Sequence, residues 1–170
     1  MRSPFNFQKW IDEHRHELKP PVGNKQVYLD NEDFIVMVVG GPNGRKDYHW
    51  EEGEELFYQF EGDITVKIMN EDGHPEDIKI REGEMFLLPP KVPHSPQRPA
   101  GSIGLVIERY RRDQEKDKLL WFCENCNHKL HEASFEMTDI VKQLPVVINQ
   151  FMEDKVLRTC DNCGTVMEKA

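Results

Sequence analysis

Short runs of apolar residues, separated by polar turns, dominate residues 25–111 of the chain. Turn residues interrupt the pattern at 41–44, 61–63 and 72–73. The runs are rich in β-branched and aromatic side chains, which favour strands; they are QVYLD, DFIVMVVGG, ELFYQFEGDITVKIM, DIKI, EMFLLPP and GLVIERY. Many short strands without helices between them predict an all-β sandwich or barrel, which can enclose a small core and leave a mouth for one small ligand.

Helical patterns flank this β region at both ends of the chain. Asn6 can cap a helix that Pro20 and Pro21 should end, and its core-facing stripe comprises Phe7, Trp10, Ile11, His14 and Leu18. A second helical region, 138–154, is interrupted by Pro145, and the charged run RRDQEKDK (111–118) is expected to be a solvated linker. We therefore expect a main domain over 1–112 and, packed on it, a C-terminal extension over 113–170.

Composition narrows the function classes. The chain has 170 residues, which favours one compact domain, and 31 acidic against 22 basic residues give a formal net charge of −9. This charge argues against a non-specific nucleic-acid binder. No apolar run approaches the roughly 20 residues that cross a bilayer, and the N-terminal segment has no signal-peptide core. The expectation is a cytoplasmic protein without a nucleic-acid or membrane partner.

Two histidines and one glutamate in the β region can bind one metal ion. His49 and Glu55 bracket Gly53 in a tight connection, so both can point to one place inside a barrel. His94 lies in the loop GEMFLLPPKVPHSPQR, where prolines stiffen the chain. Two imidazoles and a carboxylate are typical ligands of non-haem iron(II) that activates O2, because the opposite positions stay open. Histidines satisfied by backbone hydrogen bonds in a metal-free barrel are the alternative.

Three further charged residues accompany these candidate ligands. Arg45 precedes His49 by four residues, so an extended strand would place both on one face, and Arg98 follows His94 by four. Arginines in a barrel interior suit an anionic ligand, and a guanidinium binds a carboxylate through two parallel hydrogen bonds. Glu108 lies in the apolar run GLVIERY, as an ion-pair partner or an acid/base group. Internal salt bridges are the simpler interpretation for each residue alone.

The spacing of these residues resembles the two cupin motifs. His49, five residues, Glu55, six residues and Gly62 are similar to the first motif, and Gly83, Pro89 and His94 are similar to the second. The chain departs from the pattern at Glu51, where many cupins have a second histidine, and at Lys91 and Arg98. The resemblance implies a double-stranded β-barrel, or jelly roll, with a site of two histidines and one glutamate.

Longer segments resemble one cupin family, the 3-hydroxyanthranilate 3,4-dioxygenases that carry a C-terminal rubredoxin-like site. The segments are PFNFQKWIDEH, LKPPVGNKQV, VVGGPNGRKDYH, GEMFLLPPKVPHSPQRP, LVIER, WFCENC and CDNCG. This resemblance implies Fe(II) at the three candidate ligands, O2 as co-substrate and a substrate pocket formed by Arg45, Arg98, Glu108 and Asn24, with Glu108 and Arg45 in catalytic roles. It also implies a homodimer, for which the N-terminal apolar stripe is one candidate surface. The family's product, 2-amino-3-carboxymuconate 6-semialdehyde, closes to quinolinate, a precursor of NAD.

Four cysteines form a second candidate metal site. Cys123 and Cys126 make one CxxC pair, and Cys160 and Cys163 make another after 33 intervening residues. Two such pairs predict one closed tetrahedral site for zinc or rubredoxin-like iron, because four sulfurs complete the coordination shell. The polar or small residue after each pair, Asn127 or Gly164, suits a tight turn around the metal. Bound metal would stabilise the C-terminal part of the chain.

Two other functions compete with ring cleavage of 3-hydroxyanthranilate. Another cupin metal dioxygenase, acting on a different small carboxylated aromatic or on a thiol, would share the histidines and the glutamate but not the two arginines and Glu108. A zinc-ribbon interaction module would use the cysteine region as its surface. The acidic charge and the absence of clustered basic residues near the cysteines argue against the second option.

Overall fold

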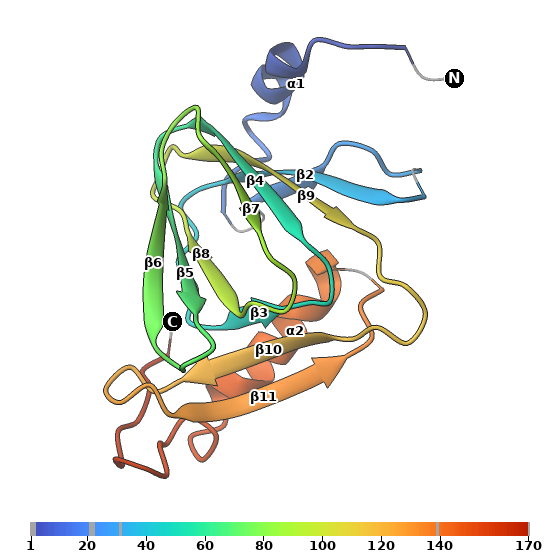
Figure 1. The fold of residues 1–170 in the computed structure, drawn as a ribbon. Coiled ribbons are helices and arrows are strands. Elements are labelled where there is room, and N and C mark those ends of the chain that lie inside the picture. Colours follow the sequence, from blue (N-terminus) through green and yellow to red (C-terminus); the bar gives the residue numbers. More distant parts are fainter. Residues whose placement is uncertain (1–2, 21–22, 31, 139, 170) are drawn as a thin grey trace.

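Two antiparallel sheets face each other, and one helix lies near each end of the chain (Figure 1). The computed structural model describes residues 3–20, 23–30, 32–138 and 140–169. In chain order its elements are α1 (Phe7–His14), β1 (Asn24–Gln26), β2 (Phe34–Gly40), β3 (Tyr48–Trp50), β4 (Glu55–Glu61), β5 (Ile64–Met69), β6 (Pro75–Ile80), β7 (Met85–Leu88), β8 (His94–Gln97), β9 (Ile103–Arg109), β10 (Asp117–Phe122), β11 (Lys129–Phe135) and α2 (Ile140–Glu153). The predicted β-dominated fold with N- and C-terminal helices is confirmed.

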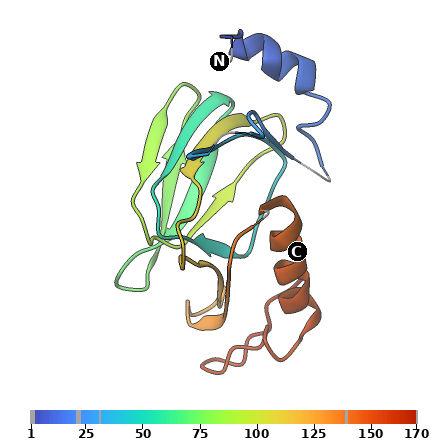
Figure 2. The ribbon, with the colours of Figure 1, turned by 90° about the vertical axis from the view of Figure 1, so that its right-hand side faces the viewer.

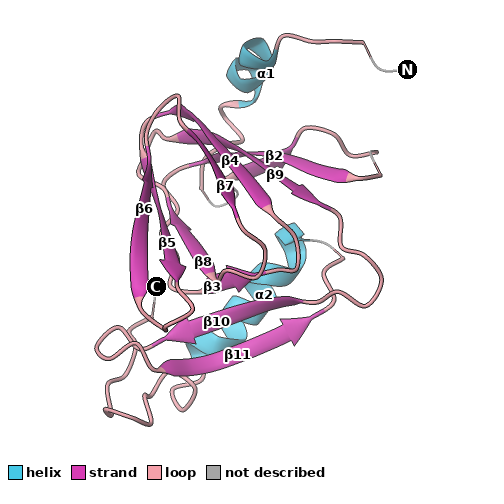
Figure 3. Ribbon diagram, viewed as in Figure 1, coloured by secondary structure: helices cyan, strands magenta, loops and turns pink. Residues whose placement is uncertain are grey.

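The two sheets enclose the main core. One sheet has the strand order β1-β2-β9-β4-β7 and the other β11-β10-β3-β8-β5-β6 (Figure 3). Alternate side chains of each strand point between the sheets, and the buried apolar ones are Ile35, Met37, Val39, Phe57, Ile64, Val66, Ile80, Leu88 and Val106. Gly62 adopts a φ of +64° in the turn between β4 and β5, which explains the turn predicted there. The strands β3, β4 and β8 bring polar side chains into this otherwise apolar space.

The helix α1 covers one end of the five-stranded sheet (Figures 1 and 2). Its predicted cap is confirmed, because Asn6 Oδ1 accepts a hydrogen bond from the Lys9 amide at 2.8 Å. The helix ends at His14, earlier than predicted, because a tight turn at 15–18 turns Leu18 onto the sheet. Pro21, the second predicted stop residue, lies outside the described residues. Ile11 and Leu18 are buried against Val38, so this stripe forms part of the chain's own core.

The helix α2 packs against β10 and β11 and forms a second core (Figure 2). Phe151 stacks on Trp121 of β10 with ring centroids 4.2 Å apart. The predicted interruption at Pro145 is wrong, because the helix runs through this residue. We attribute this continuity to the apolar contacts of Leu144, Ile148 and Phe151, which offset the one backbone hydrogen bond that proline cannot donate. Neither α1 nor α2, the helices in the described part of the chain, has the length and apolar character that crossing a membrane requires.

The segment after β9 is the largest departure from the predicted organisation. Strands β10 and β11 were not expected, and β10 pairs with β3 in the main sheet, with Leu119 opposite His49. The prediction of a solvated linker at 111–118 is wrong for Arg111, whose side chain is 7% exposed, and for Asp117, which is fully buried. Both residues lie beside the candidate metal ligands, so the C-terminal part of the chain contributes to the site.

Candidate metal centre and substrate pocket

The three candidate ligands of the barrel meet between the two sheets. His49 is the middle residue of β3, Glu55 begins β4 and His94 begins β8. His49 and His94 lie directly opposite each other in the sheet, and Glu55 Oε2 is 2.7 Å from His94 Nε2. All three side chains are buried, and one ligand atom from each lies within 4.8 Å of the others. The structure therefore brings together the three residues that the sequence predicted.

The backbone around His94 sets the chemistry of its ring. His94 Nδ1 is 3.0 Å from the carbonyl oxygen of Val92, so Nδ1 carries a proton and donates it to that oxygen, and Nε2 is the nitrogen directed at Glu55. His94 was predicted in a loop, but it starts a strand, because β8 pairs with β5 and Ile68 lies opposite His94. A strand position holds the ring more rigidly than a loop position.

Charge within the site stabilises a carboxylate at Glu55. Burial raises the pKa of Glu55, but the neighbouring His94 and His49 rings outweigh burial, so the net pKa lies below its usual value. Burial alone would lower the pKa of His94, and the Glu55 carboxylate raises it overall. Without a metal, the pair is therefore an ion pair. A divalent cation can replace the proton between Nε2 and Oε2, which is the donor set of a site with two histidines and one carboxylate.

Arg98 is a buried cation without a carboxylate partner. Its side chain makes one hydrogen bond, from Nη1 to Gln59 Oε1 at 3.5 Å, and it has no ion pair within the part of the chain that the structure describes. Burial lowers the pKa of Arg98 to about 10. A buried guanidinium is costly unless an anion pairs with it. Arg98 is therefore suited to receive an anionic ligand.

Gly104 makes room for this guanidinium. A Cβ atom at position 104 would lie 2.5 Å from Gln59 Oε1 and 2.9 Å from Arg98 Nη1. Gln59 is held in turn, since its Nε2 donates to the Glu61 carbonyl at 2.8 Å. Gln59 and Gly104 were not predicted as site residues, although the alternation of β4 places Gln59 on the same face as Glu55.

Replacing Gly104 with alanine should displace Arg98 and Gln59. We expect the variant to lose about 1 to 3 kcal/mol of stability, the usual cost of overpacking, and to bind an anionic ligand of the pocket more weakly. Gly44→Ala is the matched control, because the nearest atom to a Cβ there is 3.9 Å away. Thermal unfolding and ligand affinity of both variants check this expectation. Equal behaviour of the two variants would contradict it.

Arg45 lies beside the site but not where the sequence placed it. It was predicted on a strand with His49, whereas β3 begins at Tyr48 and Arg45 lies in the preceding loop, paired with Asp47. Its charge still acts on the site, since it opposes the rise in the pKa of His94 that the Glu55 carboxylate causes. The pairing with Asp47 takes up part of its hydrogen-bonding capacity, so Arg98 is the freer cation.

Glu108 and Asn24, the other predicted pocket residues, lie on inward-facing positions of the five-stranded sheet. Glu108 is opposite Glu55 on the neighbouring strand, and its carboxylate is 2.7 Å from Arg111 Nη1. Asn24 begins β1 opposite Val39, a residue of the main core. Directly opposite residues share a face of a sheet, so Asn24 is on the core side.

Three residues that were not predicted as site residues, Asp117, Arg111 and Glu51, complete the surroundings of the centre. Asp117 Oδ2 is 2.6 Å from His49 Nε2, and Arg111 contacts both oxygens of Asp117. Glu51 also pairs with Arg111, at 3.0 Å, and burial together with the charge of Glu108 raises the pKa of Glu51 to about 10. One signal could have identified Asp117 as a buried residue. It precedes Leu119 by two positions and Trp121 by four, so on a strand it points to the same side as these buried residues.

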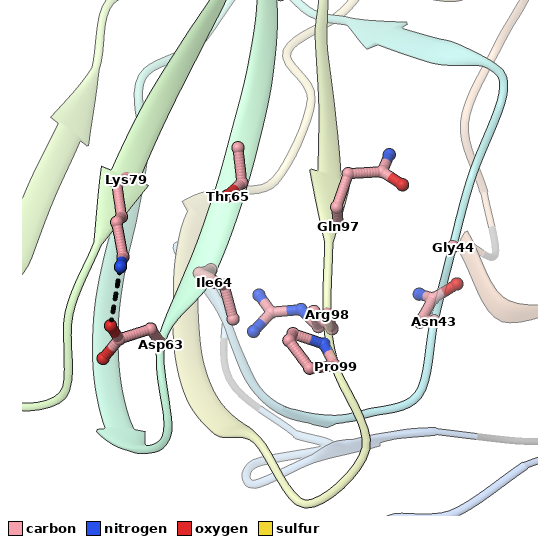
Figure 4. Close-up of a pocket in the computed structure, with 9 residues that line it drawn as sticks. All are labelled: Asn43, Gly44, Asp63, Ile64, Thr65, Lys79, Gln97, Arg98 and Pro99. Carbon is pink, nitrogen blue, oxygen red and sulfur yellow. Dashed lines mark ion pairs between the residues drawn. The ribbon is translucent and has the colours of Figure 1, made fainter.

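The pocket drawn in Figure 4 is distinct from the metal centre. It lies where the loop before β3 meets β5, β6 and β8, and its lining residues are Asn43, Gly44, Asp63, Ile64, Thr65, Lys79, Gln97, Arg98 and Pro99. None of the three candidate ligands lines it. Figure 4 shows the Arg98 side chain pointing toward Ile64, while Gln97 points to the other side. Arg98 therefore lines this surface pocket and is nevertheless only 5% exposed.

The four cysteines form a second cluster, beside the end of β10. The Sγ atoms of Cys123 and Cys163 are 3.5 Å apart, and those of Cys126 and Cys160 are 3.6 Å apart. No disulfide joins them, and one sulfur from each lies within 4.8 Å of the others. Both CxxC segments form the tight turns that the sequence predicted, and each turn closes with a residue at positive φ, Asn127 at 60° and Gly164 at 75°.

Several known proteins are similar to this chain. A relative from Xanthomonas euvesicatoria pv. vesicatoria, named 3-hydroxyanthranilate 3,4-dioxygenase, is 58% identical over 95% of this chain and 90% of its own length. A relative of the same name from Ruegeria pomeroyi is 54% identical over 96% of this chain and 91% of its own length. A solved cupin-2 domain-containing protein from Shewanella frigidimarina is 18% identical, with a TM-score of 0.49, over 62% of this chain and 93% of that one.

The family model described as 3-hydroxyanthranilic acid dioxygenase matches residues 1–152. This match includes the barrel, the three candidate ligands and the first cysteine pair. Since it covers most of the chain, and the relatives exceed half identity over nearly its whole length, the chain belongs to the 3-hydroxyanthranilic acid dioxygenase family.

Proposed function

We propose that the protein is a ring-cleaving dioxygenase that converts 3-hydroxyanthranilate and O2 to 2-amino-3-carboxymuconate 6-semialdehyde. One observation carries the proposal: in a chain of this family, a buried cluster of two histidines and a glutamate lies in the same interior as a buried arginine without an ion-pair partner among the described residues. The substrate's carboxylate fits the arginine, and its adjacent hydroxyl and amino groups fit a metal. The semialdehyde closes to quinolinate, a precursor of NAD.

His49, Glu55 and His94 would hold the metal, which we propose to be Fe(II). The donor set fits, because two imidazole nitrogens and one carboxylate leave coordination positions open. When bound, Fe(II) supplies those positions to the substrate and O2 and carries the redox chemistry of the reaction. His94 is held for this role by the Val92 carbonyl, which fixes the ring tautomer.

The protein's own side chains would bind and orient the substrate. Arg98 pairs with the substrate carboxylate through two hydrogen bonds, and Arg45 adds positive charge to steady negative charge that develops during the reaction. Glu108 moves a proton between its carboxylate and the substrate's hydroxyl or amino group, while Asn24 lines the pocket. Because the chain carries a net charge of −9, the substrate anion is repelled at long range and captured by these arginines at short range.

The four cysteines would hold a second metal ion, zinc or iron, in a closed site. The sulfurs occupy all four tetrahedral positions, so this metal stabilises the fold instead of binding substrate. We keep the division into residues 1–112 and 113–170, in which the second part packs on the first through β10 and carries this metal. Metal analysis of protein purified under anaerobic conditions distinguishes zinc from iron. Reduced, metal-binding cysteines suit the cytoplasm.

A homodimer is the assembly that we propose. Ile11 and Leu18 of the N-terminal stripe are buried within the chain, so we place the interface on the outer face of the five-stranded sheet. A row of apolar residues crosses four of its strands, Val36, Ile107, Leu56 and Leu87, and Leu87 is 52% exposed. The other three residues are half-buried, and a partly exposed apolar row of this kind suits an interface. Sedimentation velocity measures the assembly.

Oxygen consumption tests the proposed function. Protein reconstituted with Fe(II) under anaerobic conditions should consume O2 when 3-hydroxyanthranilate is added and should form a product that absorbs in the near ultraviolet. Gentisate and cysteine, substrates of other cupin dioxygenases, are the comparison substrates. Preferential turnover of either one would favour another cupin dioxygenase reaction, and no turnover of any of the three would contradict the proposal.

A further inference from the structure

A buried ionic network joins the first histidine ligand to Glu108. Asp117 contacts His49, Arg111 contacts Asp117, and Arg111 also contacts Glu108. We propose that Arg111 and Asp117 are positioning residues: Asp117 holds the His49 ring in place for the metal, and Arg111 holds Glu108 and Asp117 in a fixed relation. This inference rests on the proposed function, because Glu108 is assigned there to proton transfer.

The contact between Asp117 and His49 is set by the sheet. Strand β10 pairs with β3, with Lys118 opposite Trp50 and Leu119 opposite His49, which brings the first residue of β10 to the His49 ring. Asp117 is fully buried, and its Oδ2 is 2.6 Å from His49 Nε2. A carboxylate in this place fixes the orientation of the ring and makes it a more basic ligand.

Arg111 is placed to contact the carboxyl groups of three residues at once. Its Nε and Nη2 donate to the two oxygens of Asp117 at 2.7 and 2.5 Å, and its Nη1 lies 2.7 Å from Glu108 and 3.0 Å from Glu51. A lysine has one nitrogen and cannot span these positions, whereas the planar guanidinium has five donors in a fixed geometry. Burial of the network strengthens these interactions and makes each partner costly to remove.

A neighbouring ion pair provides the matched control. Arg109 donates to both oxygens of Glu115 at 2.6 and 2.8 Å, so this pair has the same two-bond geometry in the same segment. Both of its side chains are more exposed, at 23% and 18%, and no hydrogen bond or ion pair joins either of them to a candidate ligand. If the contacts of Asp117 contributed only to stability, substitution of Asp117 would affect metal binding no more than substitution of Glu115 does.

The first experiment compares Asp117→Asn with Glu115→Gln by Co²⁺ titration without substrate or O2. Cobalt bound by four thiolates gives a strong sulfur-to-metal absorption that a site of two imidazoles and a carboxylate lacks, so both sites are measured in one sample. An amide offers one acceptor oxygen and cannot satisfy both His49 and Arg111. We expect the affinity at the histidine site to fall about 10- to 100-fold in Asp117→Asn, with the thiolate signal unchanged, and to stay unchanged in Glu115→Gln. Unchanged affinity in Asp117→Asn, or equal losses in both variants, would overturn the inference.

The second experiment uses Arg111→Lys, which keeps the positive charge and so keeps the inference testable if Asp117→Asn fails to fold. We expect kcat with 3-hydroxyanthranilate to fall at least about 10-fold, since a displaced Glu108 transfers protons poorly. KM should change little, because Arg98 binds the carboxylate. Unchanged kcat together with unchanged Co²⁺ affinity would overturn the role of Arg111. If the protein fails to turn over 3-hydroxyanthranilate, the proposed function fails, while the Co²⁺ titration still decides whether Asp117 positions His49.

Discussion

Replacing His94 with alanine should lower O2 uptake with 3-hydroxyanthranilate by roughly 100-fold or more. Loss of residues that only support a metal ligand typically costs 10- to 100-fold, and His94 is itself a ligand in the proposed site. The variant also leaves Glu55 buried without the partner 2.7 Å away. The remaining His49 and Glu55 offer too few donors for stable Fe(II) binding. Oxygen-electrode assays and iron content per chain measure both effects.

His74→Ala is the control for this prediction. His74 is exposed in the turn before β6, away from the centre, so its loss should leave O2 uptake and iron content unchanged. Full activity of His94→Ala without bound iron would exclude the proposed metal site. Circular dichroism of both variants separates loss of metal from loss of fold.

Replacing Arg98 with alanine should mainly raise KM for 3-hydroxyanthranilate. A charge-assisted hydrogen bond contributes about 1.5 to 3 kcal/mol, which corresponds to a rise in KM of roughly 10- to 150-fold. The fold should tolerate the change, because Arg98 has no ion pair to lose among the described residues and its burial lowers its pKa to about 10. Steady-state kinetics with thermal unfolding check both parts.

Arg98→Lys is the matched variant for this prediction. It keeps the charge but binds a carboxylate through one nitrogen, so its KM should lie between those of the wild type and Arg98→Ala. A substrate analogue that lacks the carboxylate should bind to the wild type and to Arg98→Ala with equal affinity. An unchanged KM in Arg98→Ala would remove the carboxylate-binding role and leave the metal site intact.

The candidate ligands could be predicted because their signal is local. His49 and Glu55 are six residues apart around Gly53, and prolines precede His94, so each short segment carries its own spacing. The CxxC pairs and their turns at Asn127 and Gly164 are local in the same sense. Arg45 shows the limit of such reasoning. Its predicted position assumed an extended strand from Arg45 to His49, but β3 begins only at Tyr48.

The chain sequence alone determined the β-dominated fold, the two donor sets and the family, since alternation and ligand spacing are properties of neighbouring residues. Only the tertiary structure decided that Arg111 and Asp117 are buried beside the site. It also decided that Gln59 and Gly104 accommodate Arg98 and that α2 continues through Pro145. Asp117 and His49 are 68 positions apart, and their contact exists because β10 adds to the edge of β3. The physical reason is that local alternation can indicate that a charged residue points inward, but it does not identify a partner far away in the chain. The fold alone decides which distant groups are buried together.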